Sequence, residues 1–216
     1  MMRLTSVQVG KPKNIGSSDP TDLRPKVWRS GYDKAEVHGP ILLGETNLDG
    51  DGQADKRYHG GPEMAVLAYS AEHYPRWREE LAMPDLPHGA FAENFTVAGV
   101  DEQSACLGDI WELGEARLQI CQPRKPCNNI SKFWGRAELL KRVIETERYG
   151  WYFRVLKTGL VEAGQPIRLT ARPHPEWSVA RAMRARLRKS RDARAAAALA
   201  ALPELGADWR SHLTSA

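Results

Sequence analysis

The sequence is poor in features that mark several common classes of protein. Its 216 residues include only three cysteines, Cys106, Cys121 and Cys127, and none of them forms a CxxC motif. An odd number of thiols favours a reducing compartment over a disulfide framework. No apolar run approaches the roughly 18 residues of a membrane span, and the alternating start, Leu4–Val9, lacks the apolar run of a signal peptide. We therefore expect a cytoplasmic protein that has no membrane partner.

The sequence also lacks nucleotide-binding and nucleic-acid-binding motifs. It contains neither the GxGxxG fingerprint nor a Walker A loop. The net charge is +4, but nine Lys and Arg residues against four acids place +5 on residues 172–216, which leaves −1 on residues 1–171. The arginine-rich stretch 178–194 has no interleaved aromatic residues, which is typical of a solvated helix face. We expect no nucleic-acid partner.

Residues 1–171 have the pattern of a strand-rich body. Leu4–Val9 alternates with period two, and Ala65–Tyr69 is an apolar run suited to a buried strand. Gly114-Glu115 lies between two further strand patterns and predicts a hairpin. Many short strands with Gly-rich connections predict an α+β fold built on a mainly antiparallel β-barrel with peripheral helices. Other elements are expected as strands at 109–113, 116–122, 151–156 and 167–169, and as helices at 70–81 and 137–146.

The composition changes after Pro173-His174-Pro175. Ser178 is suited to cap a basic amphipathic helix, and 193–201 is rich in alanine. Trp209 and Leu213 can share one face of a third helix. We predict a barrel domain at 1–171 and a small basic three-helix C-terminal appendage at 172–216, which is too short to hold a core alone.

The most informative stretch is QPRKPCNN at residues 122–129. It follows an expected strand, and its two prolines restrict the direction of the Cys127 thiol. Arg124 and Lys125 favour the thiolate, which is both a nucleophile and a soft metal ligand. A buried structural cysteine beside surface cations is the alternative interpretation.

Two other clusters contain polar groups suited to recognising a ligand, and the second also offers donors to an anion. In GAFAENFT, residues 89–96, Glu93 and Asn94 precede an expected strand and need partners if they are buried. DKRYHGGP, residues 55–62, combines two cations, a histidine and two glycines that allow close backbone approach. These candidates are Lys56, Arg57, His59, Gly60 and Gly61. Taken alone, DKRYHGGP is more typical of an exposed turn with a solvated histidine than of a ligand site.

Residues 47–52, NLDGDG, look like the start of a calcium loop. The twelfth position is Tyr58, where a calcium loop requires a bidentate glutamate, and no helices are expected on either side. We expect a flexible acidic loop that holds no calcium.

Taken together and in this order, the motifs resemble the MOSC domain family, and the helical tail resembles that of its YiiM-type branch. The resemblance covers residues 35–171 strongly and the tail more loosely. It is carried by DKRYHGGP (55–62), GAFAENFTVAG (89–99), Gly108-Asp109 and QPRKPC (122–127). It implies a β-barrel-based fold that binds the molybdenum cofactor (molybdopterin), an anionic pterin-dithiolene, with Cys127 as the metal ligand and catalytic residue. The remaining cofactor-binding residues would then be Lys56, Arg57, His59, Gly60, Gly61, Asn94 and Arg124.

The resemblance also implies an activity, the reduction of N-hydroxylated compounds such as hydroxylamino nucleobase analogues. Because the chain has no flavin, nicotinamide or iron–sulfur motif, a separate redox protein would supply the electrons. The basic tail is then a candidate docking surface for an acidic donor, or it simply packs on the barrel. Two other functions remain open, a sulfur carrier with a persulfide on Cys127 and a non-catalytic cofactor-binding module.

Overall fold

The centre of the computed structural model is an eight-stranded sheet. The model describes residues 1–19, 21–22, 27–56, 59–188 and 190–215. The strands of the sheet are β1 (Arg3–Val9), β4 (Ala35–Val37), β6 (Val66–Ser70), β7 (Phe95–Ala98), β8 (Ile110–Leu113), β9 (Ala116–Pro123), β10 (Trp151–Lys157) and β12 (Ile167–Ala171). Their order is β12-β8-β9-β10-β6-β7-β1-β4, and every neighbouring pair is antiparallel except β6–β7.

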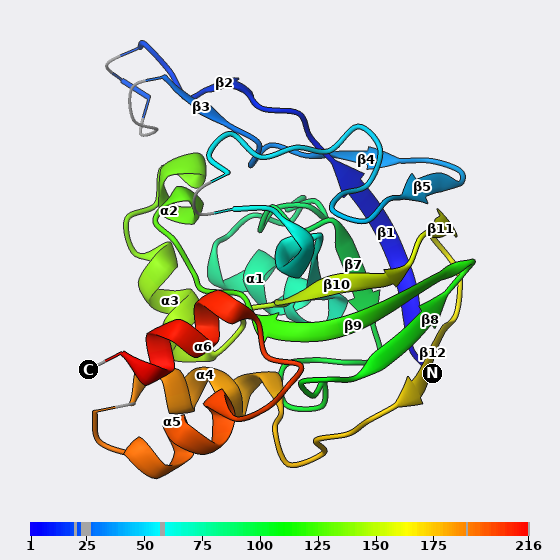
Figure 1. Ribbon diagram of the computed structural model, residues 1–216. Helices are drawn as coiled ribbons and strands as arrows, with labels where there is room; N and C mark the ends of the chain where they lie inside the picture. Colours follow the sequence, from blue (N-terminus) through cyan, green and yellow to red (C-terminus); the bar gives the residue numbers. More distant parts are fainter. Residues whose placement is uncertain (20, 23–26, 57–58, 189, 216) are drawn as a thin grey trace.

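The sheet curls until strands near its two ends meet. Leu4 donates its N–H to Gln165 O at 3.0 Å, and the Ile167 N–H bonds Met2 O at 3.0 Å. These bonds join the start of β1 to the start of β12, and Figure 1 shows the N-terminus beside β12. The prediction of a mainly antiparallel β-barrel is therefore confirmed.

Shorter elements complete the fold. Two two-stranded ribbons pair β5 (Ile41–Leu43) with β11 (Gly159–Val161) and β2 (Lys13–Ile15) with β3 (Trp28–Ser30). The helices are η1 (Pro62–Met64), η2 (Ala71–His73), α1 (Tyr74–Glu80), α2 (Asn129–Trp134), α3 (Leu139–Thr146), α4 (Val179–Leu187), α5 (Ala193–Ala200) and α6 (Ala207–Thr214). Pro75 lies in the first turn of α1, where a missing N–H costs no intrahelical bond.

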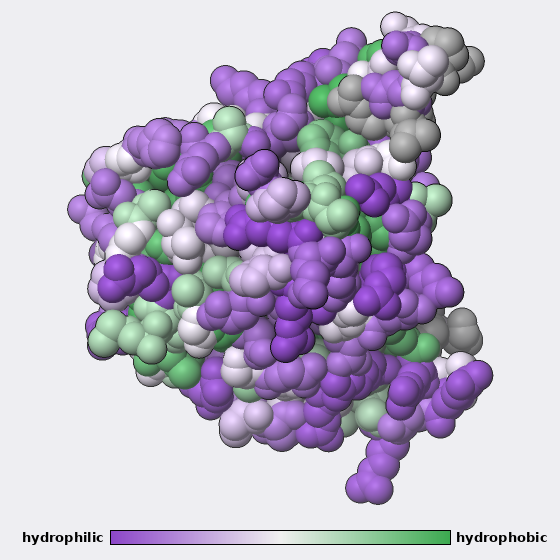
Figure 2. All heavy atoms as spheres, turned by 180° about the vertical axis from the view of Figure 1, so that it is seen from behind, coloured by the Kyte–Doolittle hydropathy of each residue, from purple (hydrophilic) through white to green (hydrophobic). Residues whose placement is uncertain are grey.

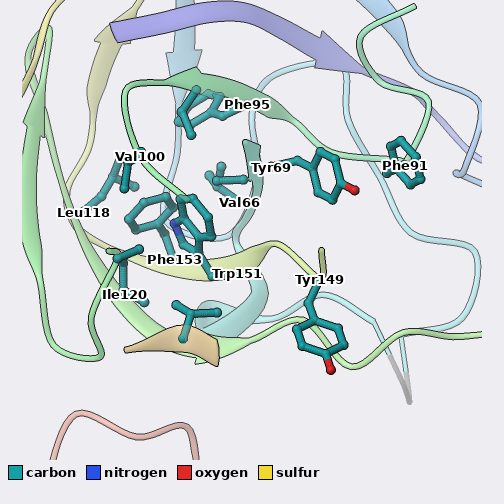
Figure 3. Close-up of a cluster of buried hydrophobic side chains, with 14 of the residues drawn as sticks. Val66, Tyr69, Phe91, Phe95, Val100, Leu118, Ile120, Tyr149, Trp151 and Phe153 are labelled. Carbon is teal, nitrogen blue, oxygen red and sulfur yellow. The ribbon is translucent and has the colours of Figure 1, made fainter. Parts of the chain in front are cut away.

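Aromatic side chains fill the interior of the curled sheet. Trp111 packs against Trp151 and Phe153 with ring centroids 6.0 and 5.0 Å away, and all three side chains are fully buried. Figure 3 shows Trp151 and Phe153 together with Leu118, Ile120 and Val66 inside the barrel. The apolar positions predicted for the strands thus form one core.

The three C-terminal helices pack on this core. Ser178 caps α4 by accepting from the Arg181 N–H at 3.2 Å, as its sequence position predicts. Trp209 and Leu213 share the buried face of α6, also as predicted. They belong to the same cluster of buried residues as the barrel interior, so these helices complete the core of the barrel. Figure 1 shows α4, α5 and α6 together beneath the barrel.

The surface seen from behind is mostly hydrophilic. Figure 2 shows hydrophobic residues there only in small groups between polar ones. Among the described residues, no helix is long and apolar enough to cross a bilayer.

Candidate functional site

A cavity of about 560 Å³ lies where the loops of the barrel meet α4 and α6. Its volume lies within the range of small-molecule and cofactor sites. Of the eight predicted site residues, those that line the cavity in the described part of the chain are His59, Gly60, Asn94, Arg124 and Cys127. Three motifs separated by dozens of residues therefore meet at one cavity.

The Cys127 loop is held at both ends by main-chain hydrogen bonds. β9 ends at Pro123, and the next N–H, that of Arg124, donates to Gly150 O at 3.0 Å. Beyond the thiol, the Ile130 N–H donates to Cys127 O at 3.3 Å as α2 begins. The half-buried Cys127 is thus fixed at the cavity wall between a strand and a helix.

The other two cysteines belong to the core. All three thiols lie in the described part of the chain, and of them Cys127 alone lines the cavity. Burial raises the pKa of Cys121 to about 12, although the nearby Arg154 opposes the shift. Burial also raises the pKa of Cys106. Both thiols therefore stay protonated, which is typical of buried structural cysteines.

Arg124 is a buried cation without a carboxylate partner. Its side chain is almost fully enclosed, and among the described residues no carboxylate forms an ion pair with it. Its electrostatic neighbours are the Tyr32 and Tyr152 phenols and the Cys127 thiol. Because a buried charge is costly unless it is paired, this guanidinium favours an anionic ligand in the cavity.

Both tyrosines beside Arg124 keep their protons. Burial raises the pKa of Tyr32 well above its ordinary value, and Arg124 opposes this only in part. The Tyr32 hydroxyl donates to Ala90 O at 3.0 Å, so it anchors the cavity wall. Burial likewise raises the pKa of Tyr152, although the positive charge of Arg124 partly lowers it.

His59 lies half-buried at the edge of the cavity. Burial and the positive charge of Arg124 lower its pKa, whereas Asp55 opposes the shift. The imidazole is therefore neutral at pH 7. Gly60 has φ +93°, a conformation that favours glycine, and a Cβ there would come within 2.7 Å of Gln53 Oε1.

Two predicted residues lie away from the cavity, and a third is not among the described residues. Lys56 and Gly61 are exposed and are not part of the cavity lining. Arg57 lies outside the described residues. The roles predicted for these three in cofactor binding stay predictions.

Asn94 lines the cavity, but its side-chain amide already forms hydrogen bonds to other protein groups. Its Oδ1 accepts from the Leu67 N–H at 3.1 Å, and its Nδ2 donates to Gln8 O at 3.2 Å. Nδ2 also donates to Asp51 Oδ2 at 2.9 Å. The geometry thus shows Asn94 holding β6 and β1 together at the wall, while its role toward a ligand stays a prediction.

Asp51 and Lys34 are cavity residues that the sequence reasoning missed. Their side chains form an ion pair and are 1% and 6% exposed. Asp51 also accepts from the Gly10 N–H at 2.9 Å. The interpretation of 47–52 as a flexible acidic loop is therefore wrong for Asp51, because the carboxylate is a buried anchor. No local pattern identifies this pair, since 17 positions separate the partners.

The helical tail supplies part of the cavity wall, which the sequence did not predict. Arg186 from α4 and Asp208 and Trp209 from α6 face the cavity. At the junction, the Gly206 N–H donates to Cys121 O at 3.1 Å, and the Ala207 N–H donates to Glu63 Oε2 at 2.7 Å. The tail therefore closes the site as well as covering the core.

These residues fit an anionic cofactor ligated through one thiolate. The cavity combines an accessible thiol at Cys127 with the buried, carboxylate-free cation Arg124. A thiolate is a soft metal ligand, and a buried guanidinium offsets the negative charge of dithiolene and phosphate groups. The donor set is thus chemically suited to the molybdenum cofactor that the family resemblance implies.

Comparison with known proteins identifies the domain family of this chain and the branch within that family. Residues 55–168 match the model of the MOSC domain, and the chain belongs to the MOSC domain family. Residues 177–215 match the model of the YiiM-like, 3-alpha helix domain, so within that family the chain is of the YiiM type. Both expectations from the sequence motifs are confirmed.

Relatives agree with this assignment. YflK of Bacillus subtilis (strain 168) is 38% identical over 206 residues, covering 95% of this chain and 90% of YflK. A protein named Reductase from Gibberella moniliformis (strain M3125 / FGSC 7600) is 44% identical over 151 residues, 68% of this chain and 26% of that protein. The crystal structure of YiiM from Geobacillus stearothermophilus, 33% identical, superposes with a TM-score of 0.81 over 99% of this chain and 97% of that chain.

Proposed function

We propose that this protein is a molybdenum-cofactor-dependent reductase of N-hydroxylated compounds, hydroxylamino nucleobase analogues among them. The observation that supports the proposal most directly is the meeting of Cys127, Arg124 and His59 in one cavity. Membership in the MOSC family and the similarity to a protein named Reductase support it further.

The overall reaction converts R–NHOH, two electrons and two protons to R–NH₂ and water. When bound, the cofactor would supply the two-electron chemistry that cleaves the N–O bond. Cys127 would ligate the metal, and Arg124 would offset the negative charge of the cofactor. The neutral His59 and its neighbour Gly60 would border the pterin.

The decisive experiment compares two cysteine variants made in a host that synthesises the cofactor. Wild-type protein should carry about one molybdenum and one pterin per chain, as one thiolate ligand can hold one metal. Cys127→Ala should lose the metal and the reduction of an N-hydroxylated purine, whereas Cys121→Ala, which removes a core thiol, should keep both. Metal content by mass spectrometry and turnover with a chemical reductant check this.

Other outcomes of the same experiment support other functions. Metal that stays with Cys127→Ala would contradict the ligand assignment. Bound metal without reduction of any N-hydroxylated substrate would favour a cofactor-binding module. A cyanide-labile sulfur on Cys127 without molybdenum would favour a sulfur carrier.

We further propose that an acidic redox protein delivers the electrons to the basic tail. Exposed arginines on and beside α4 and α5 carry the positive charge of this surface, among them Arg188, Arg191 and Arg194. Replacing these three by Glu should slow donor-dependent turnover about tenfold at low salt, because steering by charge is lost.

The control for docking is Arg117→Glu, an exposed arginine on β9 of the barrel. It should leave donor-dependent turnover unchanged, and turnover with a small chemical reductant should be equal in all variants. Equal losses with both electron sources would show that the tail arginines do not dock the donor.

A further inference from the structure

Arginines on α4 differ in what surrounds their guanidinium groups. Arg184 donates to both carboxylate oxygens of Glu147, on the surface. Arg186 is half-buried and lines the cavity, and among the described residues no carboxylate forms an ion pair with it. Burial lowers the pKa of Arg186, and no neighbouring charge in the described chain offsets this. A partly buried cation in a cavity wall without a counter-charge is available to a ligand.

The guanidinium of Arg186 lies over the indole ring of Trp209. The Arg186 Cζ lies 4.7 Å from the centroid of the indole ring. Trp209 is only 4% exposed and is packed into the core from α6, so its ring is a fixed support. The indole covers one side of the guanidinium, and because Arg186 lines the cavity, its remaining surface is available to the contents of the cavity.

The Arg186–Trp209 pair and the reactive thiol lie on different walls. Cys127 comes from the barrel loops, whereas the pair comes from two helices of the tail. Because all three residues line one cavity, the part of a substrate that reaches the helical wall while its N–O group faces Cys127 would meet the pair.

We propose that Arg186, oriented by Trp209, is a specificity-determining residue that stacks on the planar heteroaromatic ring of the substrate. The guanidinium selects N-hydroxylated compounds with such a ring over compounds that have only the N–O group. This inference rests on the proposed function for the reacting group. The contact between Arg186 and the ring can be measured by binding alone, without turnover.

The test is the binding of adenine, the amine that reduction of an N-hydroxylated adenine produces. Isothermal titration of full-length protein should show adenine binding that weakens about tenfold in both Arg186→Lys and Arg186→Ala, because Lys keeps the charge but lacks the planar face. The matched control is Arg181→Lys. Arg181 lies 4.6 Å over Trp177 in an equivalent pair that is not part of the cavity lining, so its loss should leave adenine affinity within twofold of wild type.

Kinetics separate recognition of the ring from general damage to the site. For an N-hydroxylated purine, Arg186→Lys should raise KM about tenfold with kcat within twofold. For hydroxylamine, which has the N–O group and no ring, both constants should match wild type. Thermal unfolding and molybdenum content should be the same in Arg186→Lys and wild type.

Several results would overturn the inference. Wild-type protein that binds no adenine, or Arg186→Lys that binds it as tightly as wild type, would show that no planar stacking takes place. Equal losses with both substrates, or loss of the pterin from Arg186→Lys, would assign Arg186 to the cofactor instead. If wild-type protein reduces no N-hydroxylated compound, the proposed function fails, while adenine titration still decides whether Arg186 recognises the ring.

Discussion

The two walls of the cavity are built in different ways. On the barrel wall, the main-chain N–H of Arg124 and the side chain of Asn94 form hydrogen bonds to the main chain of neighbouring strands and loops. The helical wall is held by side-chain packing of Trp209 and by a short junction at Gly206 and Ala207. The barrel wall is therefore held by hydrogen bonds between strands and loops, whereas the helical wall is held by packing and closes the space beside it. Under the proposed function, such a division would let the helices change which ligand fits while the barrel residues stay in place.

Removing Trp209 should have the largest effect on the stability that the helical wall and the barrel wall share. Trp209→Ala is expected to lower the free energy of unfolding by about 3–4 kcal/mol, because a large buried side chain is lost from a shared core. Since the helices complete the barrel core, urea unfolding followed by circular dichroism should remain a single transition. Trp28→Ala, at a half-buried site on β3, is the control and should cost much less. An early separate transition of the tail would show that the two walls fold independently.

Neutralising Glu63 should weaken the junction by a smaller amount. Its Oε2 accepts the Ala207 N–H at the start of α6, and its Oε1 accepts from Arg154 at 3.0 Å. Glu63→Gln loses both charge-assisted interactions and should lower the free energy of unfolding by about 1 kcal/mol, measured by urea denaturation. The control, Glu112→Gln in an exposed ion pair with Arg168, should change it by less than about 0.5 kcal/mol. Equal effects of the two changes would mean that Glu63 does not secure the helical wall.

The smallest effect concerns the protonation of His59. Because burial and Arg124 lower its pKa in the folded protein, the unfolded chain binds a proton more readily. The contribution of neutral His59 to stability is thus complete above about pH 6.5, the ordinary histidine value, and is lost as the pH falls toward the lowered folded pKa. Thermal midpoints between pH 5 and 8 should fall less steeply with acid in His59→Gln than in wild type. His88, whose pKa is also lowered by burial, remains in both proteins and accounts for a shared part of the slope.

Much of the fold could be predicted from local patterns. The alternating residues of β1, the hairpin at Gly114-Glu115 and the cap at Ser178 each depend on neighbours close in sequence. The ribbon strands β2, β3, β5 and β11 are three residues long, too short to carry a periodicity, and α2 has only six residues. These elements form because the surrounding structure supplies their partners.

The candidate site divides in the same way. Cys127 and Arg124 were predicted from the chemistry of neighbouring residues, and they do meet at the cavity. Two other pairs of cavity residues were not predicted, Asp51–Lys34 and Arg186–Trp209. Their members come from segments with no shared local pattern.

By itself, the sequence determined the strand-rich body, the helical tail, the position of a thiol beside two cations and the order of the motifs that define the family. Only the tertiary structure decided that the tail closes the cavity, that Arg124 is buried without a carboxylate partner among the described residues, and that Asp51 is a buried anchor. The physical reason is that periodicity and capping act over a few residues along the chain. Burial and charge pairing depend instead on which distant segments share the same space.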